Sequence, residues 1–363
     1  MTVIHLFEPS GYGGVFQHTC RLAQALHGAG REVVLHTSVE HEGVLIPDIE
    51  VCTCSWWPRP SDGSRLGSAA RRGTIARRLV TRTLPHLART PPGVLHVQGV
   101  AATGAVNLLA LSRARRAGHR VVYSPHDVFS RRGLLDEALL RRAYRVPKAI
   151  IVHSRADERR LRNVLGPVAP IHVSPLVQLV ERPTEHQRMQ WRREWHADEA
   201  ERVVLFAGFI RPEKRLDVLV ESARGWPPGR RLAVVGPDRG GWARCDDLAR
   251  AYDLDVATRL EFVDLIEFTA AIAAADLVVV PSELASQSGV LAVARRLRTP
   301  TVAADVGGMG ELASETFAAG DADDLSRAIQ LALSDGARRP DLDLDAEDDE
   351  AIAVHLRAYG FQP

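Results

Sequence analysis

The sequence has few cysteines and no long apolar run. Its 363 residues include four cysteines, Cys20, Cys52, Cys54 and Cys245, which are too few and too irregularly spaced for a disulfide framework. Cys52 and Cys54 could form half of a metal site, but no second Cys/His pair at ligand spacing accompanies them in the sequence. We therefore expect ordinary reduced thiols and no metal. No apolar stretch is long enough to span a bilayer, and the first residues, MTVIHLFEPSGYGG, lack the basic start of a signal peptide. These absences predict a cytoplasmic protein.

Lysine is nearly absent from the first half, where arginine supplies the positive charge. Residues 1–180 carry 24 Lys and Arg against 12 Asp and Glu, whereas residues 181–363 carry 22 against 33. Halves of opposite charge, in a chain that is long for one hydrophobic core, predict two domains. The positive balance of the first half indicates either an anionic partner or simply an arginine-rich composition.

Both halves alternate short β-branched runs with longer amphipathic segments. In the first half we expect strands at 3–7, 32–36, 94–97, 120–123 and 149–153, and helices at 14–28, 100–116 and 156–165. In the second half we expect strands at 203–207, 231–235, 260–263, 277–280 and 301–304, and helices that begin near Pro212, Trp242, Glu267 and Gly289. This alternation predicts an α/β protein with two Rossmann-like parallel sheets.

The domain boundary is expected in the polar, proline-containing stretch 175–199. The first Rossmann-like domain then covers residues 1–176 and the second covers 177–345. Residues 341–350 are acidic and predict a solvated connection. The tail 346–363 should form a helix, over 351–359, that packs back on the first domain.

A glycine-containing turn follows the first expected strand. Gly11, Gly13 and Gly14 let backbone amides approach a ligand at the start of a helix, which is a ready site for an anion. A dinucleotide fingerprint would need a glycine where Phe16 stands. The turn therefore has two interpretations, an anion site or a tight connection between strand and helix.

Two positive side chains follow the first strand expected in the second half. That strand ends at Gly208, and Arg211 and Lys214 lie in the next turn, where Pro212 suits the first position of a helix. Cations at this place oppose the helix dipole, and a bound anion would offset the cost. Because α/β sheets bind ligands at the carboxyl ends of their strands, an anion site is favoured over two solvated surface charges.

A serine- and glycine-containing loop precedes an apolar helix in the second half. It consists of Ser286, Gln287, Ser288 and Gly289. Either serine can cap the helix, and Gly289 leaves its first amides uncovered. A phosphate would fit there without a dedicated cation; the simpler interpretation is a well-capped buried helix.

Taken in order, these stretches resemble a known family. The matching segments are Gly13-Gly14 with LAQALHGAGREV, then YSPHDVF and AIIVHSRADERRL, and in the second half AGFIRPEKRLDVLVESA, AAADLVVVPSE and SQSGVLAVARRLRTPTVAADVGG. Their order and spacing resemble the family 4 glycosyltransferases, retaining enzymes of the GT-B fold, over nearly the whole chain. The resemblance implies two Rossmann-like domains facing each other across a cleft. The first would hold the acceptor and the second the nucleotide-sugar donor.

The resemblance also implies roles for individual residues. Arg211 and Lys214 would neutralise the donor diphosphate as the glycosidic bond breaks, which is often the largest catalytic contribution. His126 would face the donor sugar from the first domain. No protein base is required, because the leaving phosphate helps to take the acceptor proton. Further donor-binding residues would be Gly13, Gly14, Gly208, Glu283, Ser286, Gln287, Ser288, Gly289 and Val290.

The acceptor side is less marked. His96 and Gln98 end another strand of the first domain and are candidates for acceptor contacts. Asp127 is expected to orient the loop that carries His126. The Asp-x-Asp patterns of the second half lie in predicted acidic loops and helices, where solvated charge is the ordinary explanation, so neither a metal nor another cofactor is expected.

One departure from the family concerns the donor loop. Many members carry two glutamates on this loop and the following helix, where this sequence has Ala285 and Val293. The chain is similar to a branch with a Gln-Ser-Gly loop in place of the pair, and Glu283 lies close enough to replace the first glutamate. The departure leaves donor recognition open, together with a chain of reduced activity or one that needs a partner.

The segment Arg65–Arg89 carries seven arginines and no acidic residue. One interpretation is a basic amphipathic surface that meets the inner face of a membrane or a lipid-linked acceptor. A second is a helix that covers the first sheet with its arginines solvated. Nucleic-acid binding has no aromatic platform or recognised module to support it.

The sequence thus predicts a hexosyl-type glycosyltransferase. It would move a sugar from a nucleotide-diphosphate donor, with retention, to a hydroxyl of a glycan, lipid-linked precursor or natural product. Two alternatives stay open. One is a nucleotide-sugar epimerase on the same fold, and the other is a catalytically degenerate protein that binds sugar nucleotide and supports a partner.

Overall fold

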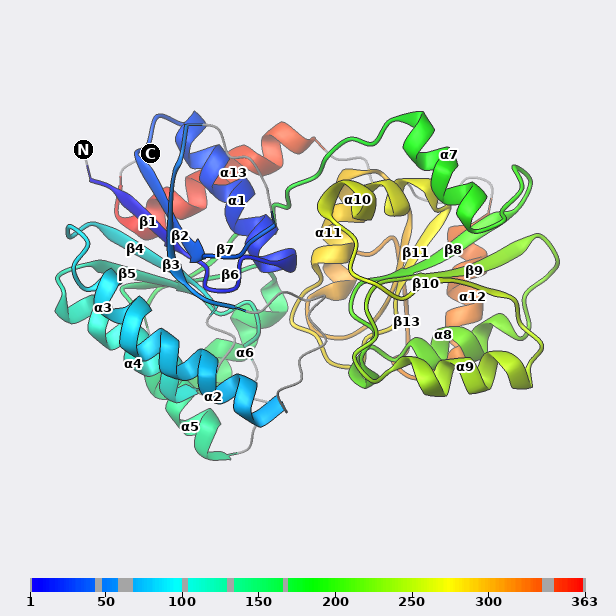
Figure 1. Cartoon of the computed structure of the whole chain (residues 1–363), viewed down its shortest axis with the longest axis horizontal. Coiled ribbons are helices and arrows are strands. Elements are labelled where there is room, and N and C mark those ends of the chain that lie inside the picture. The colour runs from blue at the N-terminus through cyan, green and yellow to red at the C-terminus, as the bar shows by residue number, and fades with distance from the viewer. Residues whose placement is uncertain are drawn as a thin grey trace. The chain divides into compact units, whose positions relative to one another are not determined.

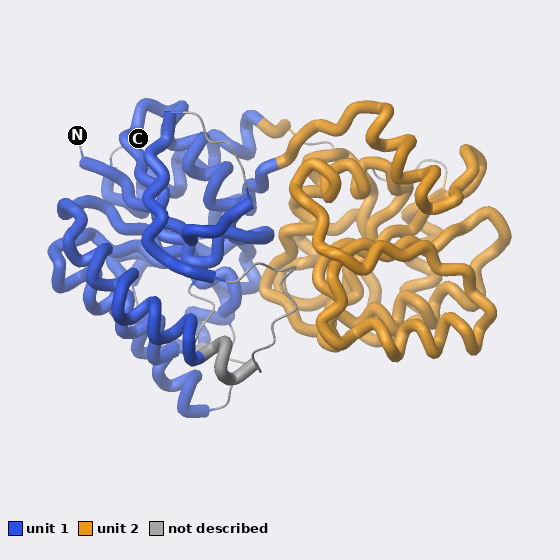
Figure 2. The backbone as a smooth tube through the Cα atoms, viewed as in Figure 1, with its two compact units in different colours: residues 1–179, 345–363 blue, residues 180–344 orange. Residues whose placement is uncertain are grey.

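The computed structural model describes residues 2–42, 48–57, 68–99, 104–128, 134–165, 169–334 and 343–361. The chain divides into two compact units (Figure 2). Unit 1 consists of residues 1–179 together with 345–363, and unit 2 consists of residues 180–344. Each unit contains one sheet with helices on both faces (Figure 1). The predicted α/β class with two parallel sheets is confirmed.

Unit 1 contains a seven-stranded parallel sheet with the order β3-β2-β1-β4-β5-β6-β7. Its strands are β1 (Ile4–Phe7), β2 (Val33–Ser38), β3 (Glu50–Ser55), β4 (Val94–Gln98), β5 (Arg120–Ser124), β6 (Ala149–Val152) and β7 (Ile171–Val173). Its helices are α1 (Gly13–Gly28), α2 (Ser68–Arg78), the π-helical turn η1 (Leu79–Thr83), α3 (Leu84–Leu87), α4 (Gly104–Arg116), α5 (Leu134–Ala143), α6 (Arg155–Leu165) and the final helix α13 (Leu344–Tyr359).

Unit 2 contains a six-stranded parallel sheet with the order β10-β9-β8-β11-β12-β13. Its strands are β8 (Arg202–Ala207), β9 (Arg230–Val235), β10 (Val256–Arg259), β11 (Leu277–Val280), β12 (Thr301–Ala304) and β13 (Glu315–Phe317). Its helices are α7 (Glu185–Glu194), α8 (Leu216–Ala223), α9 (Trp242–Ala251), α10 (Leu265–Ala274), α11 (Gly289–Arg296) and α12 (Ala322–Ala332), with 3₁₀ turns η2 (Pro212–Lys214) and η3 (Met309–Glu311).

The helices bury the two faces of each sheet. In unit 1, Phe7 and Leu95 pack with Leu84 of α3 and Leu111 of α4 on one face, while α1 and α13 lie on the other and are joined by the ion pair between Arg21 and Asp348. In unit 2, α8, α9 and α12 cover one face, and α7, α10 and α11 cover the other (Figure 1). Burial of continuous apolar strands on both faces is what a doubly wound parallel sheet requires.

Several sequence expectations need correction. Residues 260–263 are not a strand, because the edge strand β10 ends at Arg259. The stretch 175–199, where the boundary was expected, contains the division between the two units after Leu179 and also the unpredicted helix α7, whose Trp191 is buried against the core of unit 2. The acidic stretch 341–350 is helical from Leu344 on. The expected residues 65–67, 100–103, 341–342 and 362–363 lie outside the described residues.

Elements that the hydrophobic pattern did not predict lie mainly at the sheet edges. They are the strands β3, β7 and β13 and the helices α5 and α12. Edge strands are short and half-exposed, so their residues lack the continuous apolar run of a central strand. Within the described residues, no helix is both long and apolar enough to cross a membrane.

Candidate functional site

The strand order of each sheet reverses direction at one point. In unit 2 the order turns between β8 and β11, and in unit 1 it turns between β1 and β4. Loops that leave the carboxyl ends of the two central strands diverge there and leave a crevice, which is where open α/β sheets bind ligands. The candidate sites of both units are therefore the loops after these strands.

The loop after β8 carries the predicted pair of cations. Gly208 has a φ of 116°, which favours glycine. Arg211 is extended, and the 3₁₀ turn Pro212–Lys214 follows it. The helix α8 then begins at Leu216, later than the expected start near Pro212. Arg211 and Lys214 thus lie at the two ends of one short turn, as the Lys214 amide donates to the Arg211 carbonyl (2.9 Å).

A third cation adjoins this loop. The guanidinium of Arg211 lies 5.2 Å from the centre of the Phe209 ring, and that of Arg239 lies 5.9 Å from it. Arg239 follows β9, the neighbour of β8, and its amide donates to the Ile210 carbonyl (2.8 Å). The sequence analysis missed Arg239, although its place after the next strand was a usable signal. Arg211 is 46% exposed and 3.9 Å from Glu213, so it stays available to a solvated anion.

The loop after β11 leads into α11. Ser288 caps this helix, as its hydroxyl accepts from the Leu291 amide (3.3 Å). The amide of Glu283 donates to the Glu213 carbonyl (3.3 Å), which joins this loop to the loop after β8. A Cβ added at Gly208 would lie 3.7 Å from Val290. The start of α11 and the cation-bearing loop are therefore neighbours in unit 2, and the helix dipole adds positive potential there.

The loop after β12 supports the serine loop from behind. The Gly308 amide donates to the Ser286 carbonyl (2.9 Å). Gly307 has a φ of 57°, and a Cβ added there would lie 2.0 Å from the Ala285 carbonyl oxygen. Only glycine fits at position 307, so the backbone of the serine loop is held in one place.

The acidic residue of this loop has a partner within unit 2. Glu283 accepts from Arg215 at 2.8 Å, and Arg215 also donates to Asp217 at 3.1 Å. The two carboxylates raise the pKa of Arg215. Ala285 and Val293, which occupy the places of the family's paired glutamates, are buried at 8% and 1% exposure. Glu283 is therefore the exposed carboxylate nearest to those places in the sequence.

Two glutamates hold the glycine turn of unit 1. The buried Glu8 accepts from the amides of Ser10 (3.1 Å) and Gly11 (2.7 Å). Glu42 accepts from the Gly13 amide at 2.8 Å. Burial raises the pKa of Glu8 to about 7. The amides that we expected to approach an anion at Gly11 and Gly13 thus meet carboxylates of the protein, which the sequence analysis did not foresee.

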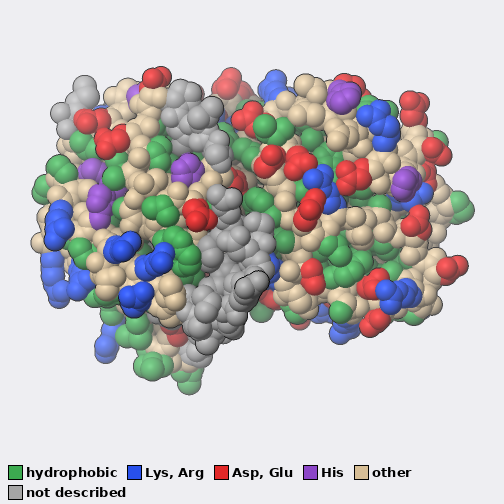
Figure 3. All heavy atoms as spheres, viewed as in Figure 1, with side chains coloured by type: hydrophobic (Ala, Val, Ile, Leu, Met, Phe, Trp, Pro, Cys, Tyr) green, Lys and Arg blue, Asp and Glu red, His purple; other side chains and the backbone are tan. Residues whose placement is uncertain are grey.

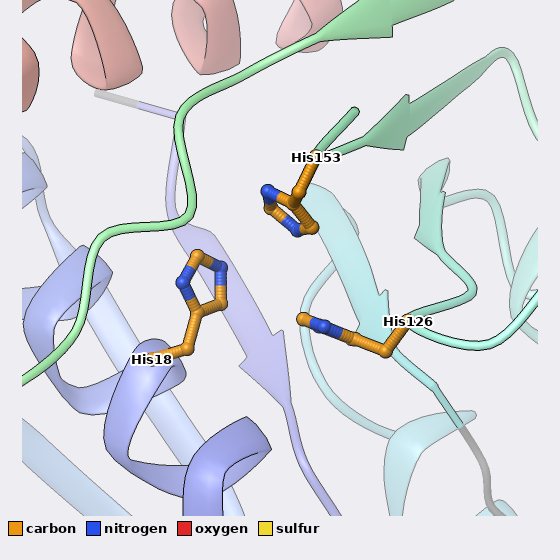
Figure 4. A group of neighbouring side chains, drawn as sticks. All are labelled: His18, His126 and His153. Carbon is orange, nitrogen blue, oxygen red and sulfur yellow. The ribbon is translucent and has the colours of Figure 1, made fainter. Parts of the chain in front are cut away.

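Three histidines of unit 1 point toward one another (Figure 4). His18 comes from α1, His126 follows β5 and His153 follows β6. The ring centres of His18 and His153 are 4.8 Å apart, and those of His126 and His153 are 5.1 Å apart. Burial lowers the pKa of His18 to about 4 and holds the pKa of His126 and of His153 well below the usual value; the neighbouring histidines add to this lowering at His126 and His153. The three rings are therefore neutral at pH 7.

Backbone and amide oxygens fix the tautomers of these rings. His18 Nδ1 donates to the Val177 carbonyl (2.6 Å), and His153 Nδ1 donates to the Ser174 carbonyl (3.2 Å). The Nε2 atoms of both rings are then bare acceptors, buried and without a partner among the described residues. His126 Nε2 donates to Gln98 Oε1 (2.7 Å). Such nitrogens can accept hydrogen bonds from hydroxyls or bind a metal ion.

The predicted acceptor residues have internal roles. His96 is fully buried, and its ring nitrogens lie 2.8 Å from the hydroxyls of Tyr359 and Ser124. This differs from the expected acceptor contact, because both ring nitrogens of His96 already have partners. Gln98 is also fully buried and orients His126. The amide of Asp127 donates to the Pro125 carbonyl (2.6 Å), so Asp127 lies in a tight turn beside His126, whose φ is 54°.

The outer surface keeps the charge difference seen in the sequence. On the face shown, Lys and Arg side chains gather over unit 1, whereas unit 2 shows many Asp and Glu side chains (Figure 3). The described part of the arginine-rich segment forms α2, η1 and α3. Leu79, Leu84 and Leu87 of this segment are buried in the core of unit 1. This agrees with a helix that covers the first sheet.

Comparison with known proteins identifies the family. Residues 12–176 match the family model described as Glycosyltransferase Family 4, and residues 187–348 match the model described as Glycosyl transferases group 1. The chain belongs to glycosyltransferase family 4. The two matches follow each other along most of the chain, one in each unit.

Solved structures of low sequence identity share the fold of this chain. Sucrose-phosphate synthase from Thermosynechococcus elongatus is 19% identical, with a TM-score of 0.71 over 99% of this chain and 96% of that one. Anabaena Alr3699/HepE, solved in complex with UDP and glucose, is 17% identical, with a TM-score of 0.70 over the same shares. These likenesses confirm the GT-B fold.

Curated relatives match a shorter part of this chain. The D-inositol 3-phosphate glycosyltransferase of Mycobacterium sp. (strain KMS) is 40% identical over 119 residues, which are 31% of this chain and 26% of the relative. The Mycobacterium tuberculosis (strain F11) protein of the same name is 38% identical over 113 residues. The match thus spans about a quarter of the length of these relatives.

Proposed function

We propose that this protein is a retaining, hexosyl-type glycosyltransferase whose nucleotide-sugar donor binds at the switch point of unit 2. The observation that carries the proposal is the junction of two loops. The loop after β8 presents Arg211 and Lys214, and the loop after β11 presents the start of α11. The hydrogen bond from the Glu283 amide to the Glu213 carbonyl joins them.

This junction suits a diphosphate. Arg211 and Lys214 supply two positive charges, and the first amides of α11 supply hydrogen-bond donors beside them. As the bond between the anomeric carbon and the phosphate oxygen breaks, negative charge grows on the leaving diphosphate. Fixed positive groups therefore stabilise the transition state more than the ground state, and this difference accelerates the reaction. Arg239 joins the same group of cations as a residue the sequence did not suggest.

Several neighbours complete the donor site in this proposal. Gly208 leaves room for the ligand beside Val290, and the backbone of Ser286, Gln287, Ser288 and Gly289 lines the start of α11. Glu283 takes the place of the family's first glutamate and binds sugar hydroxyls. Uridine diphosphate sugars are the first donors to test, since the similar fold of Alr3699/HepE was solved with UDP-glucose.

Unit 1 supplies the acceptor site. The bond that forms joins an acceptor oxygen to the anomeric carbon on the face that the diphosphate leaves, and the acceptor proton passes to a phosphate oxygen. His126 is held neutral by burial and oriented by Gln98, and it accepts a hydrogen bond from a hydroxyl of the donor sugar. His18 and His153 offer two further acceptor nitrogens for sugar or acceptor hydroxyls. Gly13 and Gly14 shape the turn beside them, with Gly14 accepting from Gln178 at 3.1 Å.

A panel of nucleotide-sugars tests the proposal. The donor should raise the unfolding temperature of the protein, because saturation a hundredfold above the dissociation constant adds about 2.7 kcal/mol. The same donor should then yield a glycosylated product when mixed with glycan, lipid-linked or polyol acceptors, among them inositol 3-phosphate, the substrate that the name of the curated relatives gives. Product stereochemistry by NMR should show retention.

Each other outcome selects a different function. Epimerised nucleotide-sugar without any acceptor product would identify an epimerase. Binding of a nucleotide-sugar without turnover, in both the wild type and an Arg211→Ala/Lys214→Ala variant, would identify the degenerate binding protein. Stabilisation by no nucleotide-sugar would refute the donor site itself.

A further inference from the structure

The first sheet carries a group of cysteine and histidine side chains near its β3 edge. His36 on β2 pairs in register with Cys52 on β3. Cys54 lies at an irregularity of this pairing, between the pairs Thr37–Thr53 and Ser38–Ser55. Its Sγ lies within 4.8 Å of ligand atoms of His36 and His86. His86 belongs to α3, and its ring centre lies 5.5 Å from that of His36. We name His36, Cys52, Cys54 and His86 the Cys–His cluster.

The distances within the cluster are close to those of a metal site. One ligand atom each from His36, Cys54 and His86 lies within 4.8 Å of the others. Cys52 Sγ lies 3.4 Å from His86 Nε2. Zinc bonds of about 2.0 Å to nitrogen and 2.3 Å to sulfur, in a tetrahedron, separate the ligand atoms by roughly 3.5 Å. Three of the four side chains are therefore close to this spacing, and the half-buried Cys52, which lies outside the group of three, must turn toward it to complete the tetrahedron.

An unpartnered nitrogen of His36 points to a missing ligand. His36 is 1% exposed, and its Nδ1 is buried without a hydrogen-bond partner among the described residues. Its other nitrogen, Nε2, lies 3.1 Å from His5 Nδ1. If Nε2 donates to His5, then Nδ1 is a bare lone pair. A metal-bound histidine commonly donates its second N–H in this way, so the His36–His5 contact has the form of an outer-shell support.

We propose that the Cys–His cluster binds Zn²⁺, with the two cysteine sulfurs and one nitrogen of each histidine as its four ligands. Two sulfurs and two imidazoles are a ligand set that selects zinc among the common divalent ions. Thiolates rather than thiols bind the metal, so zinc uptake releases protons from the two cysteines and strengthens as the pH rises.

The site is independent of the proposed donor and acceptor residues. It joins the edge strand β3 to α3, the last helix of the arginine-rich segment. A closed site with four protein ligands has no open position for a substrate. Its role is therefore structural, to fix the arginine-rich segment on the edge of the first sheet.

Cobalt substitution of the full chain tests the site directly. Titrating the metal-free, reduced protein with Co²⁺ should produce thiolate-to-cobalt charge-transfer absorption and the intense visible bands of a tetrahedral site. One equivalent of Zn²⁺ should then remove both. The group His18, His126 and His153 offers only nitrogen ligands, so cobalt there gives no sulfur band. The test thereby separates the two groups.

Ligand variants provide the second measurement. Cys52→Ser and His86→Gln alter residues that are only half-buried, and each should weaken zinc binding by on the order of 100-fold or more, since loss of outer-shell partners alone costs 10–100-fold. Cys245→Ser is the matched control, a buried cysteine of unit 2 that should bind zinc as the wild type does. Should a variant fail to fold, the wild-type cobalt spectrum still decides. A wild-type spectrum without a sulfur band, or equal zinc affinity in Cys52→Ser and wild type, overturns the proposal.

Discussion

The strands of unit 1 and unit 2 follow the same order around their first strand, yet different side chains pack against the two sheets. Unit 1 holds twelve of the fourteen histidines of the chain, and many of them are buried. The buried polar side chains of unit 2 are mainly serine and threonine, and its core is otherwise apolar. One topology thus supports two kinds of interior.

The difference follows from what each proposed site must supply. A diphosphate needs full positive charge, which a side chain keeps only when solvated or paired, so Arg211 and Lys214 stand on loops outside an apolar core. Sugar hydroxyls need neutral donors and acceptors at fixed places. Burial provides them in unit 1, because it keeps His18, His126 and His153 uncharged and their tautomers fixed.

The largest effect we expect is that acid lowers the stability of unit 1 more than that of unit 2. The unfolded state binds protons to histidines near pH 6.5, whereas folded His18, His36 and His355 have pKa values of about 4, 3 and 3. A lowered pKa means that stability present above pH 6.5 is lost as the pH falls. Each histidine should cost unit 1 about 2 kcal/mol between pH 6.5 and 5. Hydrogen exchange by mass spectrometry should show unit 1 peptides losing protection first.

Titration of Glu8 has the opposite effect on the stability of unit 1 and provides a second test. Its pKa rises from 4.5 in the unfolded state to about 7 in the folded protein, so it favours the folded state as the pH falls from 7 to 4.5. A Glu8→Gln variant, which lacks this compensation, should lose stability more steeply with acid than the wild type. If unit 2 peptides lost protection before those of unit 1 at pH 5, the buried histidines would not control the stability of unit 1.

Removal of one charge from the diphosphate loop should slow catalysis with little effect on stability. Lys214→Ala deletes a cation that acts on the leaving group, and kcat should fall on the order of 10²-fold or more. The chain has one other lysine, Lys148, exposed in unit 1. Lys148→Ala is therefore the matched control, and its kcat should stay at the wild-type value. Steady-state rates with saturating donor provide the measurement. Equal rates for the two variants would exclude Lys214 from the reaction.

Sequence reasoning predicted the central parts of the fold well. The strands β8 and β11 contain continuous apolar runs, and burial on both faces makes that pattern typical of a parallel sheet. The edge strand β10 was displaced in the prediction to 260–263, because its residues are only half-buried and alternate poorly. The helix α7 was missed because Trp191 is its one large apolar residue that is buried and lies among charged residues, although the capping box at Thr184 could be recognised in the sequence.

The candidate sites also differ in how far the sequence could predict them. Arg211 and Lys214 could be found because one short loop holds both, after a strand that the sequence marks clearly. The Cys–His cluster could not, because β2, β3 and α3 each supply part of it and only strand register brings Cys52 beside His36. Residue spacing in the sequence can reveal a site that lies in one segment. A site that is assembled from several strands and helices depends on strand register, which the sequence alone does not give.

Gly307 provides a test of how tightly unit 2 holds its serine loop. A methyl group at this residue would meet the Ala285 carbonyl, and the φ of 57° is itself unfavourable for alanine. Gly307→Ala should cost about 1–3 kcal/mol of stability and raise KM for the donor, as the loop must shift. Gly229→Ala is the matched control, since it has a φ of 85° with open space around it. Thermal unfolding and donor titration measure both; equal effects would show that backbone strain alone, without loop displacement, explains the loss.

The smallest effect should come from substitution of Glu283, which pairs with Arg215 on the surface of unit 2. This substitution tests whether Glu283 contacts the donor in place of the family's paired glutamates. Glu283 is 54% exposed, so Glu283→Gln should change stability by less than about 1 kcal/mol. A charged hydrogen bond to a sugar hydroxyl is about twice as strong as a neutral one, so KM for the donor should rise about three- to tenfold. Glu185→Gln, which breaks an exposed pair with Arg188 on α7, should leave KM unchanged. If Glu283→Gln left KM unchanged too, Glu283 would serve only to hold Arg215, and the sugar would be recognised by the serine loop alone.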